Sequence, residues 1–409
     1  MSDANNNEKS PLISIKKLYK VFGPNEKKVL KQVIAGKSKS EILKETGHTV
    51  GLSDINIDIY PGEIFVIMGL SGSGKSTLIR HFNRLIEPTA GEIILAGSDV
   101  MKLNEKDLQG FRRNKMSMVF QRFGLMPHRT VLDNIAYGLQ VQGVSKVIRQ
   151  SKAEEWLNTV GLEGYAKQYP RQLSGGQQQR VGLARALCTD AEILLMDEAF
   201  SALDPLIRSE MQDQLIELQE KLHKTIVFIT HDLDEALRIG DRIAILRDGV
   251  LVQQGKPVDI LLNPADDYVE AFVKDVNRAR ALTVETVMQP QICRISSETI
   301  GEALIQMRKS KHDYGYVVND DGYRGMITQD TLEGVEKGDH NKAIGETLLE
   351  DIPSVQNDAL LETVIPDMLD NSLPLPVLND EGDIEGNLCR TKLVDVLSDQ
   401  GSNEEEGKK

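Results

Sequence analysis

The sequence contains no long apolar run. Its two longest candidates, Ile64–Leu70 and Ile193–Met196, are far shorter than the roughly 20 residues that a membrane-spanning helix needs. The first residues, Met1–Ser10, are polar and asparagine-rich and lack the apolar segment of a secretory signal. We therefore expect a chain that does not cross a membrane by itself.

Cysteine is also scarce. The three cysteines, Cys188, Cys293 and Cys389, lie far apart and show no metal-ligand spacing. Free thiols of this kind are typical of a reducing cytosol, and they exclude a disulfide framework. The chain has 409 residues, of which 40% are hydrophobic and 27% charged. This composition predicts two or three domains with packed cores.

Positive charge is scarce at the C-terminal end. From Leu282 onward the sequence holds 26 acidic and 11 basic residues, a net charge of −15, while the whole chain carries −14. The part before Leu282 is therefore nearly neutral, and the step indicates a boundary between two kinds of domain. A nucleic-acid partner, which favours a basic surface, is not expected.

Short apolar segments alternate with amphipathic helical segments between residues 13 and 275. This alternation predicts an α/β domain with a largely parallel sheet. The expected strands include Ile64–Met68, Ile193–Met196, Thr225–Ile229 and Arg242–Leu246.

Residues 27–51 interrupt this alternation with a lysine-rich segment. Its apolar positions are Val29, Val33, Ile34, Ile42 and Leu43. We interpret this insertion as a pair of solvated surface helices, and a charged-surface sensor is the alternative.

Residues 69–77, with the sequence GLSGSGKST, match a phosphate-binding loop that follows a strand and opens the predicted helix Ser76–Leu85. Gly69, Gly72 and Gly74 permit a tight turn that directs backbone N–H groups at phosphate oxygens. We expect Lys75 to reach the β- and γ-phosphates and the Ser76 hydroxyl to bind Mg²⁺. The other loop residues assigned to the nucleotide are Ser71, Ser73 and Thr77.

Two carboxylates, Asp197 and Glu198, follow the apolar strand Ile193–Met196. A central parallel strand is continuously apolar, so two acids at its carboxyl end are not explained by packing alone. We predict that Asp197 holds Mg²⁺ and that Glu198 acts as general base on the attacking water. The alternative is an acid pair at a helix N-terminus, where the interaction with the helix dipole would stabilise the fold by only about 0.3–1 kcal/mol.

A third motif, Leu173-Ser-Gly-Gly-Gln177, precedes the predicted helix Gln177–Leu187. With the phosphate loop and the carboxylate pair in this order, residues 13–274 resemble the ABC ATPases. The resemblance implies a P-loop ABC ATPase fold with a parallel-sheet core and a helical subdomain. It also implies that Ser174, Gly175, Gly176 and Gln177 contact ATP.

Further residues match this family position by position. Gln121 resembles the Q-loop residue that senses Mg²⁺ and contacts the membrane partner. Asp204 lies in a segment that resembles the D-loop, and His231 resembles the switch histidine that contacts the γ-phosphate. Phe22 stands where the family places an aromatic that stacks on adenine, with Tyr19 as the competing candidate.

The family also implies how two copies work together. Residues 174–176 contact an ATP held by Lys75 of the opposing subunit, so two ATP molecules are sandwiched in a head-to-tail homodimer. ATP stabilises the closed dimer, and hydrolysis, which removes the bridging γ-phosphate, opens it. The implied cofactors are ATP and Mg²⁺.

The region from Leu282 to Asp399 contains a weak tandem repeat. Residues 315–322 and 325–328, GYVVNDDG and GMIT, are echoed by residues 375–382 and 386–389, LPVLNDEG and GNLC. Each unit is predicted as helix, strand, turn, strand and helix. The repeat resembles a pair of α+β CBS modules, 283–342 and 343–399, after a linker at 276–282. Residues 1–12 and 400–409 are expected to be a flexible N-terminus and a disordered tail.

The whole chain resembles the ATP-binding subunits of glycine betaine/proline (quaternary amine) importers. The insertion before Lys75, the stretch Met196–Arg208 and the C-terminal repeat carry this resemblance. It implies a permease partner in the membrane, either alone or fused to a substrate-binding domain. It also implies a peripheral position on the cytoplasmic face of the cell membrane.

CBS pairs bind adenine nucleotides between their repeats. In the first repeat Thr328 matches the phosphate contact and Asp330 the ribose contact, whereas the second repeat has Cys389 and Thr391 at these places. One hypothesis is that a cyclic dinucleotide such as cyclic di-AMP binds a CBS–CBS interface and inhibits transport. The alternative is that the repeats only dimerise.

A second hypothesis concerns ionic strength. The insertion Lys27–Lys44, or Lys146, Arg149 and Lys152, would bind anionic lipid at low salt and release it at high salt. Competing functions are import of another osmolyte or an amino acid, and a CBS nucleotide sensor with subordinate ATPase activity. A soluble ABC protein of repair or translation is disfavoured, because such proteins usually carry two cassettes or coiled-coil insertions.

Overall fold

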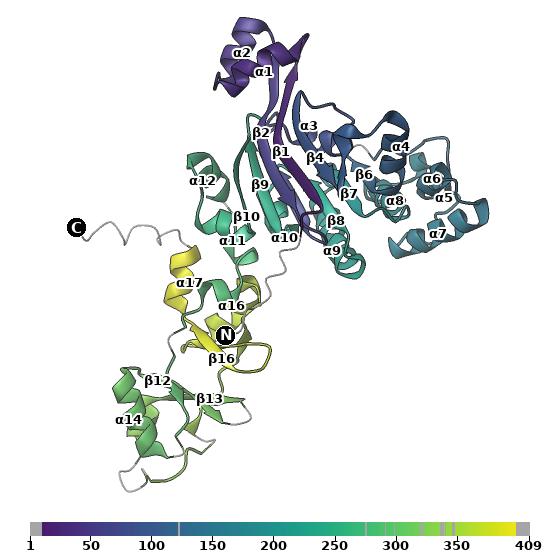
Figure 1. Cartoon of the computed structure of the whole chain (residues 1–409). Helices are drawn as coiled ribbons and strands as arrows, with labels where there is room; N and C mark the ends of the chain where they lie inside the picture. The colour runs from purple at the N-terminus through teal and green to yellow at the C-terminus, as the bar shows by residue number, and fades with distance from the viewer. Residues whose placement is uncertain are drawn as a thin grey trace, which may run out of the picture. The chain divides into compact units, whose positions relative to one another are not determined.

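The computed structural model describes residues 10–121, 123–274, 276–290, 292–297, 299–319, 322–335, 339, 341–345 and 348–397. The chain forms two compact units, Met1–Val276 and Asn277–Lys409, which are described separately (Figure 1). Most of the predicted flexible N-terminus, residues 1–9, and the predicted tail, residues 400–409, lie outside the described residues. No helix in the described part of the chain is long and apolar enough to span a bilayer.

A six-stranded sheet forms the centre of the first unit. Its strands, in spatial order, are β10 (Val250–Gly255), β9 (Arg242–Arg247), β3 (Ile64–Met68), β8 (Thr225–Ile229), β7 (Ile193–Asp197) and β6 (Met116–Phe120). All neighbours pair in parallel except β10, which is antiparallel to β9. Every residue of β3, β7 and β8 is buried, which explains their continuously apolar sequences. The predicted parallel-sheet core is confirmed.

A second, antiparallel sheet was not predicted. It consists of β2 (Thr49–Ile59), β1 (Ile13–Phe22), β4 (Ala90–Leu95) and β5 (Ser98–Asp99), in this spatial order. Apolar residues of both sheets enclose α3 (Lys75–Phe82) in the main core of the unit. The glycine-rich loop is therefore held between two sheets rather than above one.

Four helices between β6 and β7 form the helical subdomain that the family resemblance implies (Figure 1). They are α5 (Val131–Ile135), α6 (Tyr137–Val141), α7 (Lys146–Thr159) and α8 (Gly175–Leu187). Apolar residues of α5, α6, α7 and α8 share a core of their own. The remaining helices of the unit are α1 (Glu26–Ile34), α2 (Lys39–Thr46), α4 (Glu105–Asn114), α9 (Pro205–Leu222), α10 (Leu233–Ile239), α11 (Pro257–Leu262) and α12 (Asp267–Val273).

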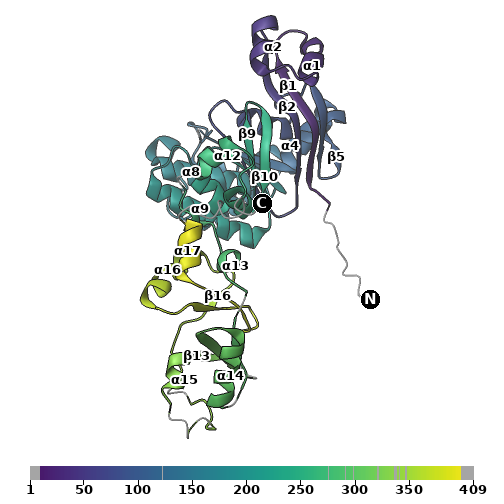
Figure 2. The same cartoon turned by 90° about the vertical axis from the view of Figure 1, so that its left-hand side faces the viewer.

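The lysine-rich insertion forms the two helices α1 and α2, which join β1 to β2 (Figure 2). Of its apolar positions, Val29, Val33 and Ile42 are buried against Val21 and Val50, whereas the other two are exposed. Its predicted end differs, because residues 49–51 already belong to β2.

The second unit contains two similar halves. The first comprises α13 (Val284–Val287), β11 (Arg294–Ile295), α14 (Ile300–Ser310), β12 (Tyr314–Asn319), β13 (Gly322–Thr328) and α15 (Gln329–Glu333). The second comprises β14 (Val355–Gln356), α16 (Leu361–Asp370), β15 (Leu375–Leu378), β16 (Ile384–Leu388) and α17 (Arg390–Leu397). Each half has a three-stranded sheet in the same order, with a parallel pair and an antiparallel hairpin. Each half thus adds a short first strand to the predicted helix, strand, turn, strand and helix.

The two halves share a buried cluster. Tyr316 and Met326 of the first half pack with Ile384 of the second. Backbone hydrogen bonds of 2.8 and 2.9 Å join Gln289 and Asn387 in both directions. The repeats therefore form one folded unit.

The predicted linker and the predicted flexible N-terminus are both partly packed against folded elements. In the predicted linker, Ala279 and Leu282 are buried, and the Arg280 guanidinium pairs with Glu362 at 3.0 Å. At the N-terminus, Leu12 is buried, and its N–H donates to the Ile59 carbonyl at 2.8 Å. The free energy gained by burying these apolar side chains exceeds the conformational entropy lost when the segments are ordered.

Candidate nucleotide site

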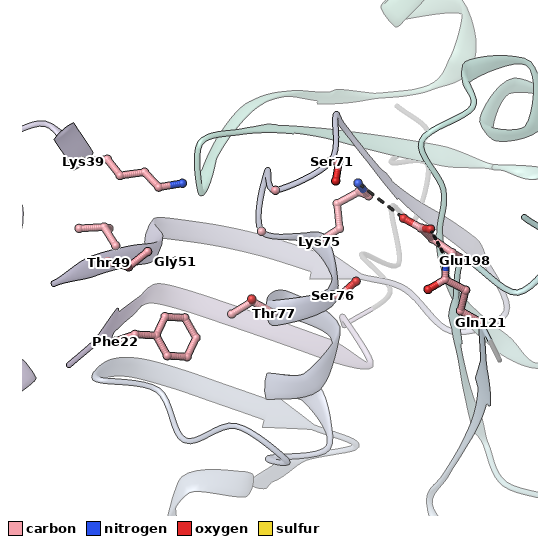
Figure 3. Close-up of a pocket in the computed structure, with 13 residues that line it drawn as sticks. Phe22, Lys39, Thr49, Gly51, Ser71, Lys75, Ser76, Thr77, Gln121 and Glu198 are labelled. Atoms are coloured by element: carbon pink, nitrogen blue, oxygen red, sulfur yellow. Dashed lines mark hydrogen bonds and ion pairs between the residues drawn. The ribbon is translucent and has the colours of Figure 1, made fainter. Parts of the chain in front are cut away.

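A pocket of about 440 Å³ lies in the first unit beside the glycine-rich loop (Figure 3). It is lined by Phe22, Lys39, Thr49, Val50, Gly51, Ser71, Gly72, Gly74, Lys75, Ser76, Thr77, Gln121 and Glu198. Its size falls within the range of small-molecule sites. Figure 3 shows Phe22 and Lys39 at one end of the pocket and Gln121 and Glu198 at the other.

The glycine-rich loop between β3 and α3 needs its glycines. Gly69, Gly72 and Gly74 have φ values of 145°, 80° and 107°, which side chains rarely adopt. A Cβ at Gly69 would lie 2.2 Å from the Leu246 carbonyl oxygen, and one at Gly74 would lie 2.9 Å from the Gly51 carbonyl oxygen. The loop is therefore a cradle whose backbone N–H groups can receive phosphate oxygens.

Lys75 begins α3 and reaches into the pocket with only 4% of its side chain exposed. Its ammonium donates to the carbonyl oxygens of Gly69 at 2.7 Å and Leu70 at 3.1 Å. Burial lowers the pKa of Lys75, and the Glu198 and Asp197 carboxylates partly offset this shift. A phosphate chain would offer this buried cation much stronger acceptors than two carbonyls.

The carboxylates lie at the carboxyl end of β7, where Asp197 is the last residue of the strand and Glu198 follows it. The Ser76 hydroxyl donates to a carboxylate oxygen of Asp197 at 2.9 Å, and the Arg80 guanidinium lies 3.7 Å from the other. Glu198 lies between Lys75, whose nitrogen is 3.9 Å from one carboxylate oxygen, and Gln121, which donates to the other at 3.0 Å (Figure 3). The residues predicted as metal ligands and general base therefore lie close to one another.

These residues fit Mg²⁺. No cluster of three or more metal-binding side chains occurs among the described residues. Magnesium in phosphate sites usually takes one or two protein ligands together with phosphate oxygens and water. Ser76, Asp197 and Gln121 would hold it, and the ion would neutralise charge on the phosphates.

Glu198 has a strained backbone. Its φ of 46° lies in the left-handed region, and its N–H donates to the Ile229 carbonyl at 3.1 Å. Strain of this kind, about 1–3 kcal/mol, clusters at active sites. The His231 Nδ1 lies 3.9 Å from a Glu198 carboxylate oxygen, so the predicted switch histidine borders the site without lining the pocket.

Phe22 rather than Tyr19 lines the pocket. Its ring packs so closely against Gly51 that a Cβ added at this glycine would lie 2.6 Å from a ring carbon. The Lys20 ammonium lies 5.1 Å from the ring centroid. Tyr19 instead packs against the insertion core. The position at the pocket end suits an aromatic that stacks on a base.

Residues 174–177 of the third motif, which are predicted to contact ATP, lie outside the pocket. Ser174 caps α8 and accepts the Gln177 N–H at 3.3 Å, while the Gln177 side chain accepts the Ser174 N–H at 3.0 Å. Gly175 and Gly176 form the first turn of α8, where a Cβ at Gly176 would lie 2.7 Å from the Ile207 side chain. Asp204 caps α9. Gly69 and Ser73 shape the loop from behind, and neither lines the pocket.

Four lining residues were missed by sequence reasoning. Lys39, Thr49, Val50 and Gly51 belong to the insertion and to the start of β2. No motif marks them; pairing of Phe22 with Thr49 across β1 and β2 brings this segment to the pocket.

In the second unit, Thr328 and Asp330 lie at the start of α15. The Thr328 hydroxyl accepts the Thr331 N–H at 3.2 Å and lies 2.8 Å from the Thr331 hydroxyl. In the second half, the Cys389 sulfur lies 3.3 Å from the Thr391 hydroxyl. Both positions therefore make local helix-start contacts.

Comparisons with known proteins agree with this geometry. The ABC transporter family model matches residues 52–201, and the CBS domain model matches residues 284–333. The dimeric ATP-binding cassette MJ0796, bound to ADP and Pi, is 34% identical and superposes with a TM-score of 0.51 over 60% of this chain and 98% of that chain.

Two curated proteins align along almost the whole chain. The glycine betaine transport ATP-binding protein OpuAA of Bacillus subtilis is 46% identical over 97% of this chain and 94% of its own length. The glycine betaine/carnitine transport ATP-binding protein GbuA of Listeria monocytogenes is 48% identical over 94% of this chain and 97% of its own. The chain therefore belongs to the ABC transporter ATPases, in the group of ATP-binding proteins that includes those of glycine betaine transport systems.

Proposed function

We propose that this protein hydrolyses MgATP to drive import of a quaternary-amine osmoprotectant of the glycine betaine type through a membrane permease. One observation carries the ATPase part: Lys75, Glu198 and Gln121 converge in a pocket whose far end holds Phe22. The similarity to OpuAA and GbuA, which serve glycine betaine and glycine betaine/carnitine transport, supports the substrate class.

In this proposal each residue has a role that its position supports. Phe22 stacks on adenine, and the loop with Lys75 holds the β- and γ-phosphates. Glu198 activates the attacking water, and its position between Lys75 at 3.9 Å and Gln121 at 3.0 Å supports this role. His231, close to Glu198, contacts the γ-phosphate.

A second copy of the chain completes the site. Ser174 lies outside the pocket that contains Lys75, so within one chain they do not share that pocket. The dimeric form of MJ0796 supports a head-to-tail pair in which Ser174–Gly176 of one copy cover the nucleotide of the other. Asp204, at the start of α9, then lies at the interface.

The permease partner places the protein on the cytoplasmic face of the membrane, whether or not the permease is fused to a substrate-binding domain.

The test of the proposed function is reconstitution with that permease in liposomes and measurement of ATP-driven uptake of labelled betaine. Wild type should import betaine, and Glu198→Gln should bind nucleotide but lose turnover by roughly two to four orders of magnitude. Uptake of other osmolytes or amino acids without betaine would support the competing substrate.

Binding of a cyclic dinucleotide such as cyclic di-AMP to the second unit is the regulatory part of the proposal, with Thr328 and Asp330 as contacts. The CBS match and the duplicated sheets support a nucleotide module. Titration calorimetry on the full chain should show heat with cyclic di-AMP. The chain carries Lys75→Ala in this experiment, so that binding at the ATP pocket does not contribute to the signal. No heat with cyclic di-AMP would leave dimerisation as the role of the repeats.

Control by ionic strength has its best support on α7. Val147 and Ile148 are 80% and 54% exposed and lie beside Lys146 and Arg149, so the start of α7 offers apolar side chains next to basic ones that could pair with anionic lipid. Activity in liposomes with anionic lipid should rise with salt, and Lys146→Ala with Arg149→Ala should flatten the response. An unchanged response in the double variant would point to the insertion instead.

A further inference from the structure

Lys39 lines the nucleotide pocket although it belongs to the insertion. It is the first residue of α2, and Figure 3 shows its side chain extending toward the glycine-rich loop. Ser38 and Glu41 cap this helix reciprocally: the Ser38 hydroxyl accepts the Glu41 N–H, and the Glu41 carboxylate accepts the Ser38 N–H at 2.8 Å. The backbone that carries Lys39 is therefore fixed.

The insertion is also fixed to the base end of the pocket. Ile42 of α2 packs with Val21 and Val50, which precede Phe22 and follow Thr49 in the paired strands. Lys39 and the ring of Phe22 are thus carried by one packed element. A nucleotide whose base stacks on Phe22 and whose terminal phosphate meets Lys75 passes beside Lys39.

The Lys39 ammonium is available for an anion. Within the described residues its charged partner is the Asp248 carboxylate at 3.8 Å, and the two side chains are 35% and 75% exposed. Such an exposed pair contributes little or nothing to stability. Exchange of this partner for a charged phosphate oxygen of the nucleotide therefore costs little and gives a charge-assisted hydrogen bond.

We propose that Lys39 is a nucleotide-binding residue, whose ammonium leaves Asp248 and pairs with the phosphate chain of the bound nucleotide. This inference rests on the proposed function and deepens it. Lys75 is the inner cation of the site and Lys39 the outer one, and only the Lys39 side chain needs to move, because the helix that carries it is already packed at the pocket.

The test is titration calorimetry of MgADP on the purified full chain. Lys39→Ala should weaken MgADP binding about 5- to 10-fold, the loss expected for one partly screened charged contact. Lys39→Arg, which keeps the charge, should stay within about twofold. The matched control is Lys44→Ala, because Lys44 is an exposed lysine of the same helix that does not line the pocket.

Two further measurements sharpen the result. Binding of adenosine, which lacks phosphate, should not change in Lys39→Ala. Asp248→Asn, which suits the left-handed φ of 52° at this position, should tighten MgADP binding about twofold in wild type and have no effect with Lys39→Ala.

Equal MgADP affinities for Lys39→Ala and Lys44→Ala would overturn the inference while leaving the ATPase proposal intact. An equal loss for adenosine would also overturn it, because Lys39 would then contact the nucleoside. Failure of wild type itself to bind MgADP would instead refute the proposed function.

Discussion

The contact between Phe22 and Gly51 gives a quantitative test of how the nucleotide base is held. A Cβ added at Gly51 would lie 2.6 Å from one ring carbon of Phe22 and 3.3 Å from the next. Carbon atoms in contact normally stay about 3.5–4.0 Å apart, so in Gly51→Ala the ring must move by about 1 Å. The ring, at the end of β1 and partly exposed, yields more easily than the paired backbone.

The expected loss follows from the energy of stacking. An aromatic side chain under a base contributes about 1–3 kcal/mol, so Phe22→Ala should weaken MgADP binding roughly 30-fold. Gly51→Ala displaces the ring without removing it and should cost about 3- to 10-fold. Because the change acts through the ring, it should have almost no effect when Phe22 is already alanine.

The assay is a double-mutant cycle of MgADP affinities by fluorescence or calorimetric titration. Gly110→Ala is the matched control, since a Cβ at Gly110 meets nothing within 4 Å and this residue lies in α4, away from the pocket. It should leave affinity unchanged and stabilise the helix by about 0.5–1 kcal/mol. An equal loss from Gly51→Ala with and without Phe22 would refute the reasoning, because the added methyl would then obstruct the nucleotide directly.

Three other outcomes follow from the structure. Gly69→Ala should lower the free energy of unfolding by about 1–3 kcal/mol and abolish nucleotide binding, because its Cβ would meet the Leu246 carbonyl oxygen at 2.2 Å; a thermal melt with and without MgADP checks both effects. Arg185→Ala should lower the free energy of unfolding of the first unit by about 1.5–3 kcal/mol, because it removes hydrogen bonds to the Gly124 and Phe123 carbonyls at 2.6 and 2.9 Å. Chemical denaturation measures this loss. Burial raises the pKa of Cys188 to about 11, so at pH 8 iodoacetamide should modify the partly exposed Cys389 first, and equal labelling in the native protein, mapped by mass spectrometry, would contradict this.

The central strands were predictable because each is a buried apolar run with polar ends. The limits of β3 and β8 agree with the prediction, and β7 and β9 differ by one residue. The antiparallel sheet was not predictable in this way. In β1 the alternation of buried and exposed residues breaks near Lys17, whose φ is 45°, and in β2 it breaks near Asp54, whose φ is 51°. Such irregularities remove the period of two that identifies a half-buried strand.

The site was predictable only where a motif encodes it locally. The glycine-rich loop and the carboxylate pair each need fixed residue types at fixed spacing, so both could be located in the sequence. Lys39 and Gly51 could not, because strand pairing and helix packing bring them to the pocket. Lys39 is also one of several lysines in its segment, and no local pattern separates it from Lys44.

The helix α8 connects the two ends of the proposed nucleotide sandwich within each chain. Ser174 caps its first turn, and near its other end Arg185 donates to the carbonyls of Phe123 and Gly124. These residues follow closely after Gln121, which contacts Glu198 in the pocket. If the proposed nucleotide displaces Gln121, we expect the segment to which α8 is bonded to shift with it. Because Ser174 caps that same helix, we expect that, in the proposed dimer, nucleotide binding in one chain's pocket changes the surface that this chain offers to its partner's nucleotide.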